Sequence, residues 1–193
     1  MSRRLFLPFA ILVLGFAGVG LGSFLTLSKQ AGVPIPSIGG PFRLASSNGG
    51  EATDADFKGH PFLVFFGYTH CPDICPTELF QMSQMLKAAG ADKPLKVLFI
   101  TADPERDTAP VMKQYLSSFD SRIIGLTGTR AQINAVEKEY RVYARKVPSA
   151  NGKDYSMDHT AVIYLMDKQG QFVSAFDIER PPQVAAQDLE AYL

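Results

Sequence analysis

Residues 67–79 read Gly-Tyr-Thr-His-Cys-Pro-Asp-Ile-Cys-Pro-Thr-Glu-Leu and contain both cysteines of the chain, Cys71 and Cys75. They follow an apolar run, residues 61–66, that is rich in β-formers and predicts a buried strand. Pro76 suits the first position of a helix, where a missing N–H costs nothing, and apolar residues recur at helical spacing beyond it. The pattern predicts strand, loop and helix. It places two thiols beside a helix N-terminus, where the helix dipole favours thiolate.

The composition describes an ordinary globular chain. Its 193 residues are 46% hydrophobic and carry 19 basic and 19 acidic side chains, for a formal net charge of zero. The length suits one domain of about 150 residues with additional segments. Without Arg3, Arg4 and Lys29, sixteen basic residues face nineteen acidic ones. This balance excludes a basic nucleic-acid-binding surface, so we expect no nucleic-acid partner.

The first apolar segment, residues 5–27, carries no charge and consists almost wholly of apolar or small residues. As a helix rising about 1.5 Å per residue it would span roughly 34 Å, enough to cross a bilayer. Basic residues in the short tail 1–4 predict a cytoplasmic N-terminus. We expect an uncleaved single-pass anchor in the inner membrane of a bacterium, with the C-terminal domain in the periplasm. A cleaved secretory signal or a twin-arginine signal would export the same domain to an oxidising compartment.

Beyond the anchor, residues 28–41 are rich in proline and glycine and are typical of a linker. The domain that follows, 42–193, predicts a β-hairpin, then β-α-β-α-β-α, then β-β-α. This order indicates an α/β domain with a central mixed sheet and the cysteine loop at the carboxyl end of a central strand. A thioredoxin-like fold with an N-terminal β-hairpin and an inserted helix and strand fits it. We expect strands at 42–45, 51–53, 61–66, 95–101, 123–126, 142–147, 161–166 and 171–176, and helices from 76, from about 110, from 129 and over 183–193.

The cysteine spacing bears on three kinds of chemistry. A structural disulfide is the simplest interpretation in an exported chain, but a Cys71–Cys75 bridge closes a tiny loop and would stabilise the fold only weakly. Redox dithiols of the thioredoxin kind have two intervening residues, whereas three residues separate these two cysteines. The spacing still permits a disulfide, and it also lets two sulfurs converge on a soft ion such as cuprous copper.

A third ligand would come from the histidines, which are His60, His70 and His159. His60 lies in a turn and should be exposed. His70 adjoins Cys71, but neighbouring positions of an extended segment point to opposite sides. His159 lies in a polar loop, residues 154–160, directly before an apolar strand. A thioredoxin-like topology places that loop beside the cysteine turn, so His159 is the preferred third ligand.

Other residues near these positions have two interpretations each. Asp158 either accepts the second N–H of the His159 imidazole or caps the loop. Met157 carries a thioether suited to copper, although a place in the core or at its rim is the stronger expectation. Residues 103–108, Asp-Pro-Glu-Arg-Asp-Thr, form either a βα turn with internal salt bridges or a contact for a partner.

Three motifs, residues 67–76, 103–108 and 155–160, resemble in order and spacing those of the Sco/SenC family of copper proteins. The resemblance runs from about Pro41 to the C-terminus and extends to the preceding membrane anchor. It implies a thioredoxin-like domain that binds a copper ion through the two cysteines and His159. It also implies a role in assembling the binuclear copper centre, CuA, of cytochrome c oxidase subunit II.

Two functions from different classes remain. The preferred one is a membrane-tethered metallochaperone, which takes copper from a donor protein and delivers it to cytochrome c oxidase subunit II or another copper acceptor. The tether would raise its effective concentration near a membrane-bound acceptor. The alternative is an enzyme, a thiol–disulfide oxidoreductase in which Cys71 or Cys75 attacks an acceptor disulfide and the other cysteine resolves the mixed disulfide. In that case His159 would be only an electrostatic neighbour.

Overall fold

The apolar run before the cysteines forms strand β3, Phe62–Gly67, in a computed structural model that describes residues 37–150, 152 and 154–193. Every residue of β3 is buried, as expected for a strand that is covered on both faces of its sheet. The other strands are β1 (Arg43–Ser46), β2 (Glu51–Thr53), β4 (Lys96–Thr101), β5 (Ile123–Thr127), β6 (Ala144–Pro148), β7 (Tyr155–His159), β8 (Ile163–Met166) and β9 (Phe172–Ala175). The helices are η1 (Asp54–Phe57), α2 (Ile74–Ala89), α3 (Ala109–Leu116), α4 (Arg130–Glu139) and α5 (Pro182–Glu190).

Seven of the strands form one mixed sheet in the order β2-β1-β5-β4-β3-β8-β9. Strands β3, β4 and β5 are parallel, while β1 and β8 pair with them in the antiparallel direction. The opening hairpin β1–β2 is present as predicted. The structure therefore confirms an α/β domain with a central mixed sheet, and it places the cysteine loop at the carboxyl end of β3.

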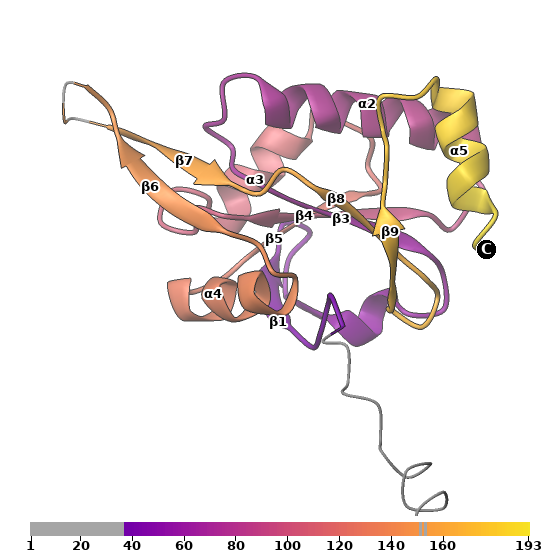
Figure 1. Ribbon diagram of the computed structural model, residues 1–193, viewed down its shortest axis with the longest axis horizontal. Helices are drawn as coiled ribbons and strands as arrows, with labels where there is room; N and C mark the ends of the chain where they lie inside the picture. Colours follow the sequence, from indigo (N-terminus) through magenta and orange to yellow (C-terminus); the bar gives the residue numbers. More distant parts are fainter. Residues whose placement is uncertain (1–36, 151, 153) are drawn as a thin grey trace, which may run out of the picture. The chain divides into compact units, whose positions relative to one another are not determined.

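The two faces of the sheet carry separate parts of the core. Leu63 and Phe65 of β3 belong to one cluster of buried residues, and Val64 and Phe66 belong to the other. Helices α2, α3 and α5 cover the first face, and α4 covers the second (Figure 1). Because successive side chains of a strand point to opposite faces, β3 anchors both halves of the core.

Helix α2 begins two residues earlier than the sequence predicts. Its first residue is Ile74, and Asp73 precedes it as the N-cap. Pro76 is therefore the third helical residue, where its missing N–H still removes no intrahelical hydrogen bond. As a result, Cys75 lies inside the first turn of the helix rather than in the loop before it.

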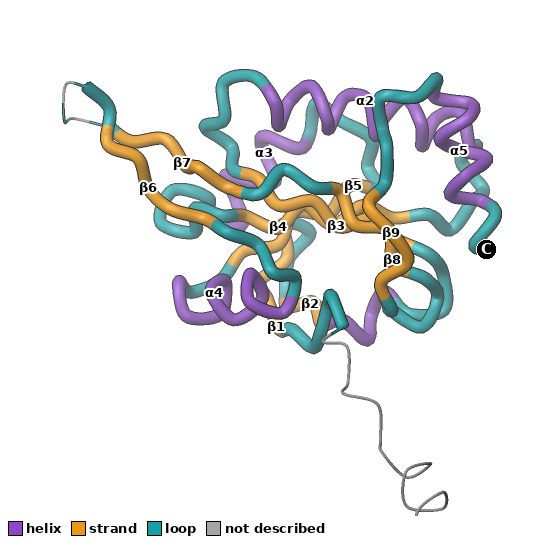
Figure 2. Tube along the Cα trace, viewed as in Figure 1, coloured by secondary structure: helices purple, strands orange, loops and turns teal. Residues whose placement is uncertain are grey.

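The prediction of a polar loop before β8 is wrong. Residues 155–159 form strand β7, which pairs with β6 in a separate two-stranded sheet (Figure 2). Along β7, Ser156 and Asp158 are exposed and Met157 is buried. This alternation is the period of a strand, but the polar composition of the segment conceals it.

The predictions for the tail 1–4 and the membrane anchor 5–27 lie outside the described residues, as does most of the linker 28–41. At the described end of the linker, the Gly39 N–H donates to the Glu139 carbonyl at 2.9 Å. Within residues 37–150, 152 and 154–193, no helix is both long enough and apolar enough to span a bilayer.

Candidate metal centre

The two cysteines lie where β3 ends and α2 begins. The Cys71 N–H donates to the Tyr68 carbonyl at 3.2 Å. The Cys75 N–H, in the first turn of α2, donates to Cys71 Sγ at 3.4 Å. The two thiols are not bridged, and Cys71 is partly exposed while Cys75 is buried. The helix start therefore directs a backbone donor at the more accessible sulfur, an arrangement suited to an anionic acceptor.

Cys75 is held in a tight apolar site. A Cβ placed on Gly67 would lie 2.9 Å from Cys75 Sγ and 2.5 Å from a ring carbon of Phe99. Burial raises the pKa of the Cys75 thiol well above its ordinary value, although a hydrogen bond from the Tyr68 backbone opposes that shift. The expected stabilisation of thiolate by the helix dipole is thus outweighed by burial at this cysteine. A metal ion bound here would displace the thiol proton.

His159 is the last residue of β7, and its ring presents one nitrogen for a ligand. Nδ1 lies 3.0 Å from the Thr160 carbonyl oxygen. Because a carbonyl can only accept, this contact requires the proton on Nδ1 and leaves the lone pair on Nε2. Asp158, its strand neighbour, pairs instead with Arg145 at 3.3 Å. In this structure the acceptor for the His159 N–H is therefore the Thr160 carbonyl, and a role for Asp158 stays a prediction.

Tyr68 connects the cysteine loop to the hairpin, and the sequence interpretation did not single it out. Its ring meets the His159 ring edge to face, with centroids 5.8 Å apart. Burial raises the pKa of its hydroxyl, which is hydrogen-bonded to the Met157 backbone. Within the described part of the chain, no three His, Cys, Asp or Glu side chains are grouped closely enough to hold a metal ion. The predicted ligands are therefore neighbours of one tyrosine rather than a preassembled site.

The other two histidines have different surroundings. His60 is exposed in the turn before β3, as predicted. His70 has half of its side chain exposed, and its Nδ1 lies 3.1 Å from Thr69 Oγ1. That hydroxyl donates its own proton to Asp107, so it accepts from the imidazole. This contact holds the His70 side chain on the solvent-exposed side of the cysteine loop.

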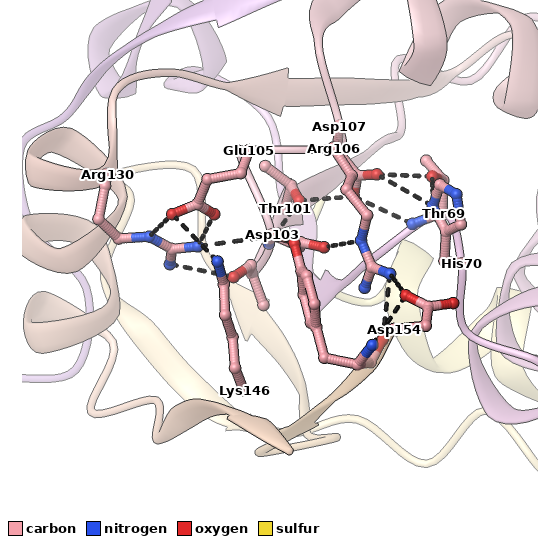
Figure 3. Close-up of polar contacts among 12 residues, drawn as sticks. Thr69, His70, Thr101, Asp103, Glu105, Arg106, Asp107, Arg130, Lys146 and Asp154 are labelled. Carbon is pink, nitrogen blue, oxygen red and sulfur yellow. Dashed lines mark hydrogen bonds and ion pairs between the residues drawn. The ribbon is translucent and has the colours of Figure 1, made fainter. Parts of the chain in front are cut away.

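The loop 103–108 is held by an internal ion pair between Arg106 and Asp103 and by contacts to neighbouring segments. Asp107 is fully buried, and its carboxylate accepts from the Thr69 N–H at 3.0 Å, from Thr69 Oγ1 at 2.5 Å and from Thr101 Oγ1 at 2.7 Å (Figure 3). Glu105 of the same loop forms ion pairs with Arg130 and with Lys146 of β6. The Arg106–Asp103 pair supports the interpretation of this loop as a βα turn with an internal salt bridge, and the other contacts join the turn to the cysteine loop, α4 and β6.

Comparison with known proteins identifies the family of the chain. The sequence profile of the family described as SCO1/SenC matches residues 32–193. The chain belongs to the SCO1/SenC family. Most of it, from the linker to the C-terminus, is thus accounted for by one family, and the family predicted from the three motifs is confirmed.

Several SCO1/SenC relatives are close in sequence and structure. Bradyrhizobium japonicum ScoI, solved with copper bound, is 56% identical with a TM-score of 0.78, over 81% of this chain and 100% of that one. Yeast Sco1 with copper bound is 39% identical with a TM-score of 0.72, over 81% of this chain and 88% of that one. The mouse mitochondrial SCO1 homolog is 39% identical over 172 residues, which are 88% of this chain and 61% of the relative. The chain thus spans less than two thirds of the length of that relative.

Proposed function

We propose that this SCO1/SenC protein binds one cuprous ion through Cys71, Cys75 and His159 and delivers it during the assembly of cytochrome c oxidase. The observation that carries the proposal is the placement of two unbridged thiols and an imidazole with a free Nε2 around Tyr68. Two thiolates and an imidazole suit Cu(I). Two relatives, 56% and 39% identical, were solved with copper bound, which supports the same cargo here.

In this proposal the copper ion draws its three ligands together as it binds. The described part of the chain has no three such side chains already close enough to hold an ion. His159 already presents its lone pair, whereas Cys75 must give up a proton that burial retains. Three ligands leave one side of the ion open. An incoming thiolate of an acceptor can reach the ion on the side of Cys71, the partly exposed cysteine, and displace that ligand.

The acceptor that fits the family is the CuA site of cytochrome c oxidase subunit II, and a separate donor protein would load the ion. Residues 5–27 would anchor the protein in the inner membrane of a bacterium. The domain would then lie in the periplasm, where a short tether raises its effective concentration near a membrane-bound acceptor.

A second candidate is a thiol–disulfide oxidoreductase, because one cysteine is accessible and the other is buried behind it. The Cys71 thiolate would attack the acceptor disulfide, form a mixed disulfide and release one acceptor thiol. Cys75 would then attack Cys71 Sγ, form the Cys71–Cys75 disulfide and release the second thiol. The acceptor gains two electrons, and an external thiol must reduce the protein again. His159 has no part in these steps.

The test is anaerobic titration of the reduced full-length protein in detergent with Cu(I), in competition with a chromophoric chelator. We expect one ion per chain, and affinity at least about 100-fold lower in Cys71→Ser, Cys75→Ser and His159→Ala, since even indirect partners of a metal ligand are worth about 10–100-fold. His60→Ala is the matched control, because His60 is exposed at the opposite end of β3, and it should bind as the wild type does.

Two results would refute the copper proposal: weak binding by the wild type, or unchanged affinity in His159→Ala. Thiol–disulfide exchange with a CuA-type peptide disulfide then tests the oxidoreductase. That activity should survive His159→Ala and be lost in Cys71→Ser.

A further inference from the structure

The hairpin that carries His159 stands apart from the main sheet. In the described part of the chain, β6 and β7 pair with each other and with no strand of the seven-stranded sheet, and they extend away from it (Figures 1 and 2). Backbone pairing with β3 begins at Ile163 of β8, four residues after His159, so the hairpin itself is not held by the main ladder. Side-chain contacts therefore contribute to the distance from His159 to the cysteines, and Arg106 supplies several of them.

Arg106 joins the loop between β4 and α3 to the start of β7. Its Nε donates to the carboxylate of Asp103, which is fully buried. Its Nη1 donates to the Tyr155 carbonyl and to Asp154 Oδ1, each at 3.0 Å, as Figure 3 shows for the aspartates. Its guanidinium carbon lies 3.8 Å from the centroid of the Tyr155 ring. The Tyr155 hydroxyl closes the set by donating to Asp103 Oδ1 at 2.9 Å.

The same loop also holds the cysteine loop. Asp107, the next residue after Arg106, binds the backbone N–H and the hydroxyl of Thr69, which is two residues before Cys71. Tyr155 lies four residues before His159 on the same strand. One short turn therefore contacts both segments that carry the candidate ligands.

The chemistry of this link requires an arginine. The planar guanidinium donates in two directions and stacks on an aromatic face at the same time, whereas a lysine ammonium is a compact point charge. Asp103 is a buried carboxylate, so a positive charge at position 106 stabilises it whether the residue is arginine or lysine. Lysine at position 106 would preserve the charge for Asp103 but lose both the forked donation to the hairpin and the stacking on Tyr155.

We propose that Arg106 is a positioning residue that sets the place of His159 relative to Cys71 and Cys75 by clamping β7 to the β4–α3 turn. The inference rests on the proposed function, because it assigns Arg106 an effect on copper binding that is exerted through His159. Arg106 contacts none of the three candidate ligands. Its contacts reach the hairpin four residues before the imidazole, and its guanidinium carbon also lies 5.9 Å from the centroid of the Tyr68 ring.

The test is a double-mutant cycle in the full-length protein, measured by anaerobic Cu(I) competition. Arg106→Lys should weaken Cu(I) binding at least about tenfold, and the same substitution in a His159→Ala background should have no further effect, since coupled residues are not additive. X-ray absorption of loaded Arg106→Lys should show a reduced nitrogen contribution with two sulfur ligands retained.

Arg122→Lys is the matched control. The Arg122 and Arg106 side chains are 19% and 18% exposed and both pair with an aspartate, but Arg122 lies directly before β5 and donates to the Gly90 carbonyl. The Arg122→Lys variant should bind Cu(I) as the wild type does.

Tyr155→Phe repeats the cycle with a smaller change, in case Arg106→Lys fails to fold. It should weaken binding at least about threefold, the order of one lost hydrogen bond.

The possible failures are distinguishable. Unchanged affinity in both Arg106→Lys and Tyr155→Phe, with His159→Ala impaired, would overturn the positioning role and leave the copper site intact. A loss that persists in the His159→Ala background, or that Arg122→Lys shares, would also overturn it by indicating a general effect on the fold. If His159→Ala binds Cu(I) as the wild type does, the proposed function itself fails.

Discussion

At the scale of single residues, the absence of a side chain at Gly67 decides where the Cys75 sulfur can lie. Gly67 is the last residue of β3, and its backbone passes directly against Cys75 Sγ and the Phe99 ring. A cysteine in the first turn of a helix is normally close to solvent. Here the helix start is pressed onto the strand, so Cys75 is buried while Cys71, four residues earlier, remains partly exposed.

Gly67→Ala should therefore both destabilise the fold and disturb the metal site. Its Cβ would lie 2.9 Å from Cys75 Sγ, which is buried, and 2.5 Å from the rigid ring of Phe99. Overpacking of this kind costs about 1–3 kcal/mol. We expect that loss in urea unfolding, together with an affinity for Cu(I) at least about tenfold lower, because displacement of a ligand by about an ångström is felt in binding.

Gly125→Ala separates the two effects. Its Cβ would lie 2.9 Å from Leu116 and 3.1 Å from Met112 under α3, so it overpacks the same core without touching a cysteine. It should lose stability, though less than Gly67→Ala because the ends of the Leu116 and Met112 side chains can move, and it should keep its affinity for Cu(I). Equal copper affinity in Gly67→Ala and wild type would show that the close approach of Gly67 serves packing alone.

At the scale of secondary-structure elements, the sequence predicts best those segments whose local pattern and final environment agree. The buried strand before the cysteines and the capping box of α4 are both present, the latter with Thr129 accepting from the Gln132 N–H at 3.3 Å. The hairpin strand β7 could not be predicted, because its polar composition resembles a loop and its pairing depends on β6 beyond a turn. The topology predicts that His159 lies beside the cysteine turn, and its ring does contact Tyr68; its role as a ligand stays a prediction. The sequence does not single out Tyr68 and Arg106, since their contacts join segments far apart in the chain.

The hairpin should differ from the main sheet in amide hydrogen exchange. Among the described strands, β6 and β7 have only each other as partners, whereas β3 is paired on both sides. Local opening of the hairpin therefore breaks fewer hydrogen bonds, and its amides should exchange at least about 100-fold faster than those of β3. Loading with Cu(I) should slow exchange in β7, because an ion held by His159 opposes opening.

Strand β9 is the matched comparison for this effect. In the described part of the chain it lies at the edge of the seven-stranded sheet and pairs only with β8, so it has the same one-sided bonding but no candidate ligand. Its exchange should be insensitive to copper. Equal slowing of β9 and β7, or protection of the free hairpin as strong as that of β3, would contradict the view that copper closes the hairpin onto the cysteines.

At the scale of the whole molecule, the remaining expectation concerns residues 5–27, which lie outside the described part of the chain. Their uncharged, apolar sequence with Arg3 and Arg4 before it predicts an anchor with the domain on the far side of the membrane. The chain carries its own reporter of this topology. Cys71 and Cys75 are its two cysteines, and Cys71 is the partly exposed one.

A membrane-impermeant maleimide added to intact spheroplasts should label the full-length protein, and Cys71→Ser should reduce labelling to background while Cys75→Ser should not. The labelled protein should stay with the membranes after alkaline carbonate extraction, because an uncharged and mostly apolar segment such as 5–27 cannot leave the bilayer without exposing its apolar surface to water. Labelling that appears only after lysis would place the domain in the cytoplasm. Release by carbonate would argue instead for a cleaved or peripheral N-terminus, and delivery of copper to a membrane-bound acceptor would then proceed without the gain in effective concentration that a tether provides.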